Sequence, residues 1–108
     1  AIQAGIAGIG TITTVAPGDT TNIITFTDVA SATSYNLYWK TTAGVATTDN
    51  QIAGVTSPYT HTGRTNGQAY YYVYTAIIAS VETNISNELS GTPAAPAPPY
   101  KVLYALRA

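Results

Sequence analysis

The chain has 108 residues, four basic and five acidic side chains, a formal net charge of −1 and no cysteine. This length suits one domain, and the lack of cysteine excludes disulfides and cysteine-based metal or redox sites. The near-neutral charge offers no footprint for nucleic acid, and no apolar run approaches the ~20 residues of a membrane-spanning helix.

β-branched residues dominate the composition, with 19 Thr, 10 Ile and 7 Val, while methionine is absent. Such side chains are stiff at χ1 and favour strands over helices. We therefore expect an all-β fold. The scarcity of charge on the presumed surface is unusual for a cytosolic protein. It predicts an extracellular or cell-surface location, where glycans or copies of the chain cover the surface.

In chain order, short strands alternate with turn signals. Seven strands are predicted, at residues 11–15, 22–29, 34–41, 45–52, 55–62, 69–78 and 84–92, of which 45–52 is a weaker strand or a loop. Pro58 interrupts the fifth and favours an edge position, and residues 63–67 form a turn at Asn66-Gly67. Seven strands at this spacing indicate a β-sandwich.

Two strands show a clear period of two. In the third, Tyr35, Leu37 and Trp39 face the core, and Tyr38 lies on the opposite face. In the sixth, alternate tyrosines are expected in the core, and one points outward. Tyr38 and the outward Tyr71 are the best candidates for an exposed aromatic platform. The buried set is Tyr70, Tyr72 and Tyr74.

Both ends of the chain depart from this pattern. Residues 1–10 are apolar and glycine-rich, and we expect an arm that needs a partner surface. Residues 94–99 are a stiff proline-rich spacer, and residues 100–108 read as a further apolar strand. The first residue is not methionine, so we expect a processed protein or a piece of a longer one. The residues predicted to mediate self-association are Ile2, Ile6, Ile9, Tyr100, Val102, Leu103, Tyr104 and Leu106.

Residues 11–93 resemble a fibronectin type III domain of the kind found in secreted and surface bacterial proteins. The resemblance is carried by ATSYNLYWK at 32–40, TSPYTHTG at 56–63, TNGQAYYYVYTA at 65–76 and SNELSGTP at 86–93. It implies an immunoglobulin-like sandwich of seven strands, with Tyr70 as the tyrosine-corner residue and Phe26 at the usual place of a strand-B tryptophan. Two departures are Arg64, where leucine is usual, and residues 79–84, where the loop usually carries glycine.

No catalytic or metal-binding constellation is apparent. His61 is expected to be an exposed strand histidine, because no nucleophile or acid accompanies it. The acidic residues are dispersed and form no calcium-loop motif, so we predict no metal, no cofactor and no enzymatic activity. Asn84-Ile85-Ser86 is a sequon for N-glycosylation. The dispersed acids are Asp19, Asp28, Asp49, Glu82 and Glu88.

The charges separate along the chain. Residues 1–93 hold two basic and five acidic residues, a net −3, whereas residues 94–108 hold Lys101 and Arg107 and no acid, a net +2. A basic strand on a stiff spacer suits strand addition to a neighbouring copy. The tail could instead fold back on its own domain or lead into a further domain.

We therefore predict a non-enzymatic structural subunit of an extracellular filament or surface assembly, self-associating by strand donation. Its partners would be copies of itself, with glycans as a second class. The alternative is a spacer or binding module from a larger secreted enzyme or adhesin.

Overall fold

The computed structural model describes residues 10–96, whose regular secondary structure is entirely β-strand. Eight strands lie in this part of the chain: β1 (Ile12–Gly18), β2 (Thr21–Phe26), β3 (Ser34–Lys40), β4 (Asn50–Ala53), β5 (Tyr59–His61), β6 (Tyr70–Ile78), β7 (Val81–Glu82) and β8 (Leu89–Gly91). The all-β prediction is confirmed.

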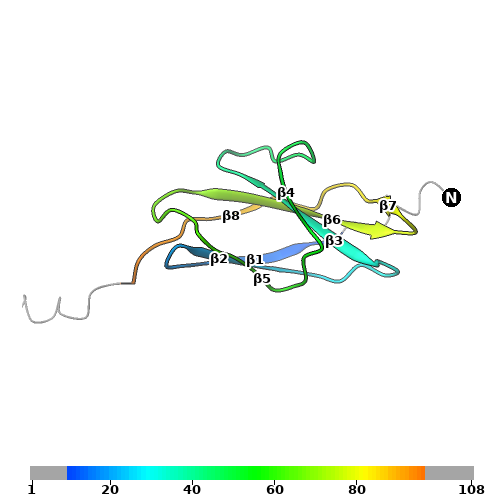
Figure 1. The fold of residues 1–108 in the computed structure, drawn as a ribbon, viewed down its shortest axis with the longest axis horizontal. Helices are drawn as coiled ribbons and strands as arrows, with labels where there is room; N and C mark the ends of the chain where they lie inside the picture. The colour runs from blue at the N-terminus through cyan, green and yellow to red at the C-terminus, as the bar shows by residue number, and fades with distance from the viewer. Residues whose placement is uncertain (1–9, 97–108) are drawn as a thin grey trace, which may run out of the picture.

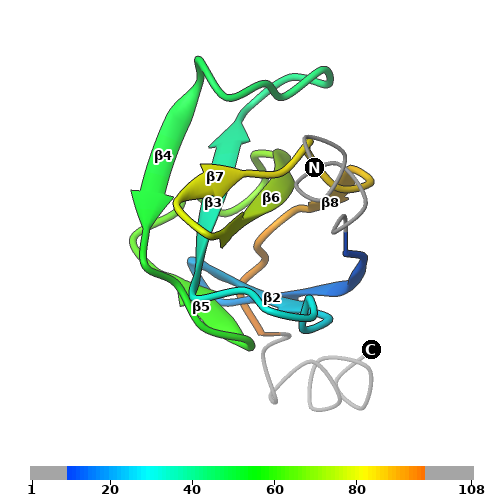
Figure 2. The same cartoon turned by 90° about the vertical axis from the view of Figure 1, so that its right-hand side faces the viewer.

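The strands form two layers (Figure 1). A three-stranded sheet has the order β1-β2-β5, and a five-stranded sheet has the order β4-β3-β6-β7, with β8 also paired to β6. Each pairing is antiparallel. Viewed along the layers, the two sheets face each other with the β3–β4 connection projecting from the five-stranded sheet (Figure 2).

The core lies between the inner faces of the two sheets. Leu37 is fully buried, and Tyr35 and Trp39 are half-buried against the same cluster, as the alternation of this strand predicts. Phe26 also lies in this core, at the position expected from the resemblance. The other buried members are Ile12, Ile24, Val29, Val55, Tyr70, Tyr72, Tyr74 and Ala76.

The outer face of the five-stranded sheet carries a second, smaller core. Residues 41–49 fold over this face, and Val45 packs there against Tyr38 and Val73, with the half-buried Tyr71 beside them. Tyr38 is consequently only 2% exposed. The prediction of Tyr38 as an exposed aromatic platform is wrong. Its side chain has the expected direction, but the loop covers it.

Two strand boundaries differ from prediction because of proline. Strand β1 runs to Gly18, past the expected stop after Val15, and Pro17 pairs with Asn22. This is possible because β1 is an edge strand, where a missing N–H removes no ladder bond. Strand β5 begins only after Pro58, and it lies at the edge of its sheet as predicted.

The last predicted strand, 84–92, is regular only at β8, and a further short strand precedes it. This short strand, β7, is joined to β6 through Ala79 and Ser80, which have φ of 50° and 66° where hairpins favour glycine. Between β7 and β8 the hydroxyls of Thr83 and Ser86 accept hydrogen bonds from the backbone N–H of β6, at 3.0 Å each. Only 89–91 is therefore a regular strand, and the described chain has eight strands where seven are predicted.

Side-chain amides join the two sheets where no ladder does. The Asn87 amide donates to the carbonyl of Ile12 at 3.1 Å, and its oxygen accepts from the Ile12 N–H at 2.8 Å. The fully buried Asn22 donates to Tyr72 Oη and to the carbonyl of Gly91, both at 3.1 Å. The two hydrogen bonds of Asn87 occupy the outer edge of β1 at Ile12, where a neighbouring strand could otherwise pair.

The described chain enters and leaves the sandwich at opposite ends (Figure 1). Gly10 lies against the Tyr74 hydroxyl, before β1 starts. At the other end of β1, the Ala94 N–H donates to the Gly18 carbonyl at 3.1 Å. The predicted arm, except Gly10, and the predicted strand 100–108 lie outside the described residues.

Candidate functional site

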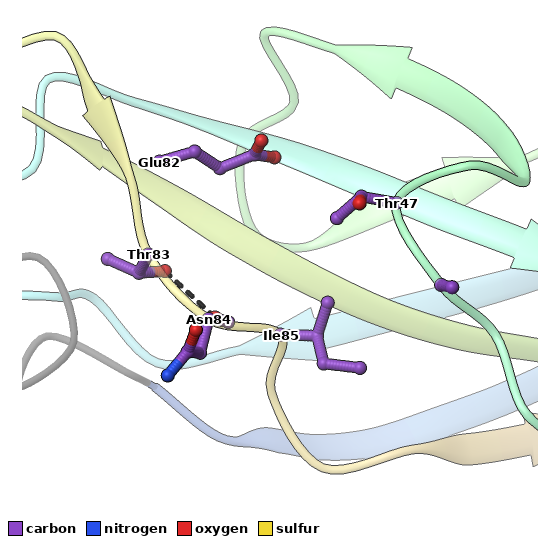
Figure 3. Close-up of a pocket in the computed structure, with 6 residues that line it drawn as sticks. Thr47, Glu82, Thr83, Asn84 and Ile85 are labelled. Atoms are coloured by element: carbon purple, nitrogen blue, oxygen red, sulfur yellow. Dashed lines mark hydrogen bonds between the residues drawn. The ribbon is translucent and has the colours of Figure 1, made fainter.

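A pocket of about 390 Å³ opens on the outer face of the five-stranded sheet, between the 41–49 loop and the segment that follows β7. Figure 3 shows its walls, with Thr47 on one side and Glu82 and Ile85 on the other. This size falls in the range of ligand pockets. The lining residues are Ala46, Thr47, Glu82, Thr83, Asn84 and Ile85.

The loop wall of the pocket is held by carboxylates. Glu88 accepts hydrogen bonds from the backbone N–H of Val45 at 2.8 Å and of Gly44 at 3.1 Å. Asp49 accepts from the Ala46 N–H at 2.7 Å and pairs with Lys40 at 3.4 Å. Since these acids bond to the loop, dispersed positions in the sequence converge to shape one wall.

Glu82 places a carboxylate on one wall of the pocket. Its Oε2 accepts hydrogen bonds from Tyr38 Oη at 2.5 Å and Thr75 Oγ1 at 2.6 Å. Burial acts to raise the pKa of the Glu82 carboxyl, but hydrogen bonds led by that of Thr75 outweigh it, and the pKa lies below its ordinary value. Burial, followed by the bond to Glu82, raises the pKa of Tyr38. The pocket therefore holds a negative charge at neutral pH.

His61 is 5% exposed, so its predicted exposure is wrong. Its Nδ1 lies 2.9 Å from Tyr72 Oη, and its ring packs edge-on against Trp39 with centroids 4.8 Å apart. Burial, followed by the charge of Arg64, lowers the pKa of His61 to about 4. Burial also raises the pKa of Tyr72 to about 12. His61 is therefore a neutral residue of the core.

Arg64 closes this end of the core. Its guanidinium lies 4.7 Å from the centre of the Trp39 ring and 5.5 Å from that of Tyr70, and its Nε donates to the Thr62 carbonyl at 3.0 Å. Arginine here covers aromatic rings as leucine would, while its charge stays half-exposed. The Tyr70 hydroxyl accepts from the Thr65 N–H at 2.9 Å, which confirms the tyrosine corner.

Of the predicted site residues, only Asn84 lies in the described part of the chain, exposed at the rim of the pocket. Ser86 of the same sequon is buried, and its hydroxyl bonds to the backbone of Tyr74 and Asn87. The predicted self-association residues lie outside the described residues: Ile2, Ile6, Ile9, Tyr100, Val102, Leu103, Tyr104 and Leu106.

The pocket itself is not apparent from the sequence. Its walls depend on hydrogen bonds that Glu88 and Glu82 accept from Val45 and Tyr38, which lie 43 and 44 residues away along the chain. The only local signal is a glycine-containing, weakly patterned stretch at 41–49. Within residues 10–96, no group of three or more histidine or acidic side chains is placed to hold a metal ion. No helix in that part of the chain is long and apolar enough to cross a bilayer.

The sequence matches no protein-family model and no curated protein. Among solved structures, an Fn3-like protein from Clostridium thermocellum is 29% identical, with a TM-score of 0.63 over 82% of this chain and 93% of that one. A beta-1,2-glucanase from Parabacteroides distasonis is 16% identical, with a TM-score of 0.65 over 93% of this chain and 14% of that enzyme. The second likeness concerns the fold alone.

Topology, tyrosine corner and structural neighbours agree that this is a fibronectin type III-like β-sandwich. The first neighbour matches over nearly its whole length, so the sandwich is a module of the same size. The secreted or surface bacterial form expected from the sequence stays a prediction.

Proposed function

We propose that this module is a non-enzymatic subunit of an extracellular filament or surface assembly, and that it self-associates through its terminal segments. The observation that carries the proposal is the position of the two ends. The described chain starts beside Tyr74 and leaves beside Gly18, at opposite ends of the sandwich (Figure 1). Segments that leave opposite ends can reach different neighbours, and repetition of that contact produces an open filament.

The edges of the two sheets are consistent with strand addition. Within residues 10–96, β4, β5, β7 and β8 each pair with one strand and leave one backbone edge open. The edge of β1 is different, because the Asn87 amide occupies it at Ile12. A strand from a neighbour would gain main-chain hydrogen bonds at an open edge. We therefore propose that the donated strand adds to one of these open edges.

The absence of enzymatic activity is part of the proposal. The single histidine is buried and neutral at physiological pH, and it contacts aromatic rings instead of a nucleophile. The pocket between the 41–49 loop and residues 82–85 holds one carboxylate, whereas general acid–base hydrolysis of a glycoside uses two.

Negative-stain electron microscopy and light scattering of the purified chain test the proposal. We expect regular polymers from the 108-residue chain and their loss after deletion of residues 100–108. Deletion of residues 1–10 separates the contribution of the arm. Circular dichroism of each truncated chain serves as the folding control. A uniform 11 kDa monomer at all concentrations would contradict self-association, and polymers that survive the C-terminal deletion would contradict donation of that strand.

A second function is a spacer or binding module within a larger secreted enzyme or adhesin. It is favoured by one observation, namely that the fold matches 14% of the length of a beta-1,2-glucanase. This alternative predicts a monomer with or without residues 100–108. The same measurements therefore discriminate between the two functions.

A further inference from the structure

Glu82 has bonding capacity directed into the pocket. Its Oε2 accepts bonds from Tyr38 and Thr75, and the side chain of Asn36 also hydrogen-bonds to the carboxylate and lowers its pKa. Figure 3 shows the carboxylate pointing across the pocket toward Thr47. Because a carboxylate has about four acceptor positions, it keeps capacity for a charged donor beside these bonds.

The described part of the chain supplies no cation to this carboxylate. Lys40 pairs with Asp49, and Arg64 lies over the ring of Trp39. The hydrogen bonds to Glu82 hold the pKa of its carboxyl below the ordinary value, so the charge persists at neutral pH. The ligand that fits this chemistry is a lysine or arginine side chain.

Apolar surface flanks the charge. Ile85, on the pocket wall, is 37% exposed. It is among the three large hydrophobic residues that are most exposed in residues 10–96. A cation carried between apolar residues would bond to the carboxylate and cover this side chain at the same time.

We propose that the pocket receives Lys101 from the C-terminal segment of a second copy of this chain. This rests on the proposed function and names the acceptor for one residue of the donated segment. Lys101 lies between Tyr100 and Val102, and residues 97–108 contain two basic and no acidic residues. The positive charge of that segment therefore complements the net −3 of residues 1–93. The apolar neighbours of Lys101 suit contact with the exposed Ile85.

The donor comes from another copy because of where the chain leaves. The Ala94 N–H bonds to Gly18 of the three-stranded sheet, whereas the pocket opens on the outer face of the other sheet, near β7. Figure 1 shows that the described chain leaves the sandwich at the end opposite to β7. Residues 97–108 reach about 40 Å when extended, which is sufficient to cross to a neighbour placed end to end.

Carbodiimide cross-linking of the assembled chain tests this pairing directly, since it joins a lysine to a carboxylate in contact. A 1:1 mixture of unlabelled and ¹⁵N-labelled chains is cross-linked, digested and analysed by mass spectrometry. We expect a Lys101–Glu82 product that includes mixed-label pairs, and its loss in Glu82→Gln. The Lys40–Asp49 pair, 3.4 Å apart, is the internal positive control and should give same-label products only.

Assembly thresholds of matched variants provide a second readout. Glu82→Gln keeps an acceptor oxygen for Tyr38 and removes the charge. Glu82→Gln and Lys101→Gln should each raise the critical concentration for assembly roughly two- to fivefold. The variant that carries both substitutions should raise it little further. Asp28→Asn, at an exposed acid elsewhere, and Arg107→Gln are the charge-matched controls and should have smaller effects.

Several results would overturn the pairing. Assembly with Lys101 joined to another carboxylate, or with same-label Lys101–Glu82 products only, contradicts this inference and leaves the proposed function standing. Equal effects of Glu82→Gln and Asp28→Asn on the critical concentration would also contradict this inference and leave the proposed function standing. The net charge of the chain, and not a specific pair, would then explain both effects. A chain that stays monomeric contradicts the inference and the proposed function together.

Discussion

The buried histidine makes the stability of this module depend on pH in a range where carboxyl groups contribute little. The pKa of His61 is about 4 in the folded chain, against 6.5 for an unperturbed imidazole. Because the folded value is lowered, the unfolded chain binds the proton first as the pH falls below about 6.5. Stability is therefore lost progressively between about pH 6.5 and 4.

The magnitude follows from these two values. From pH 7 to pH 5 the loss amounts to about 2 kcal/mol, and it reaches about 3 kcal/mol at pH 4. The carboxyl of Glu82 has a lowered pKa, so the stability it provides is lost at still lower pH. Since the chain contains one histidine, the pH 7 to 5 window isolates His61.

Urea denaturation at pH 7, 6 and 5, followed by circular dichroism, measures the effect. His61→Gln is the comparison variant, because its side chain does not titrate. We expect the free energy of unfolding of the natural chain to fall by about 2 kcal/mol across this window and that of the variant to stay nearly constant. Equal slopes for both proteins would refute the reasoning, whatever their absolute stabilities.

Three further substitutions test the packing. Tyr70→Phe leaves the Thr65 N–H without its acceptor and should lower the free energy of unfolding by about 1–3 kcal/mol in urea denaturation; no change would show that water replaces the hydroxyl. Gly91→Ala would put a Cβ within 2.8 Å of Asn22 Oδ1, and thermal unfolding should show about 1–3 kcal/mol of destabilisation. Val45→Ala should lower stability by about 2 kcal/mol and increase quenching of tyrosine fluorescence by acrylamide, because it opens the outer-face cluster; an unchanged protein would contradict the role of the loop as a cover.

The sequence predicted those parts of the fold that depend on alternation. In β3 the period of two identifies Leu37 as core, and the resemblance places Phe26 and Tyr70 correctly. Prediction from the sequence failed where a feature depends on a segment that is distant along the chain. Tyr38 has the side-chain direction expected, yet a loop held by Glu88 buries it.

Short and irregular strands account for the other errors. β5 has three residues, too few for alternation to establish that His61 points inward. The segment from Thr83 to Ser86 follows β6 through hydroxyl groups, and such bonds leave no periodic pattern. The candidate pocket combines both effects, because its walls are one loop and one irregular strand. Among its residues, only Asn84 was predicted from the sequence to be a site.

The opposite placement of the chain ends also determines how the module would respond to tension. A pull on Gly10 and on Pro96 acts along the strands, because the first end lies before β1 and the second follows β8 (Figure 1). The hydrogen bonds between β1 and β2 run across that direction. They would therefore be loaded in shear and would have to break together, whereas a peeling force breaks such bonds one at a time. This arrangement suits a module that transmits load along its length.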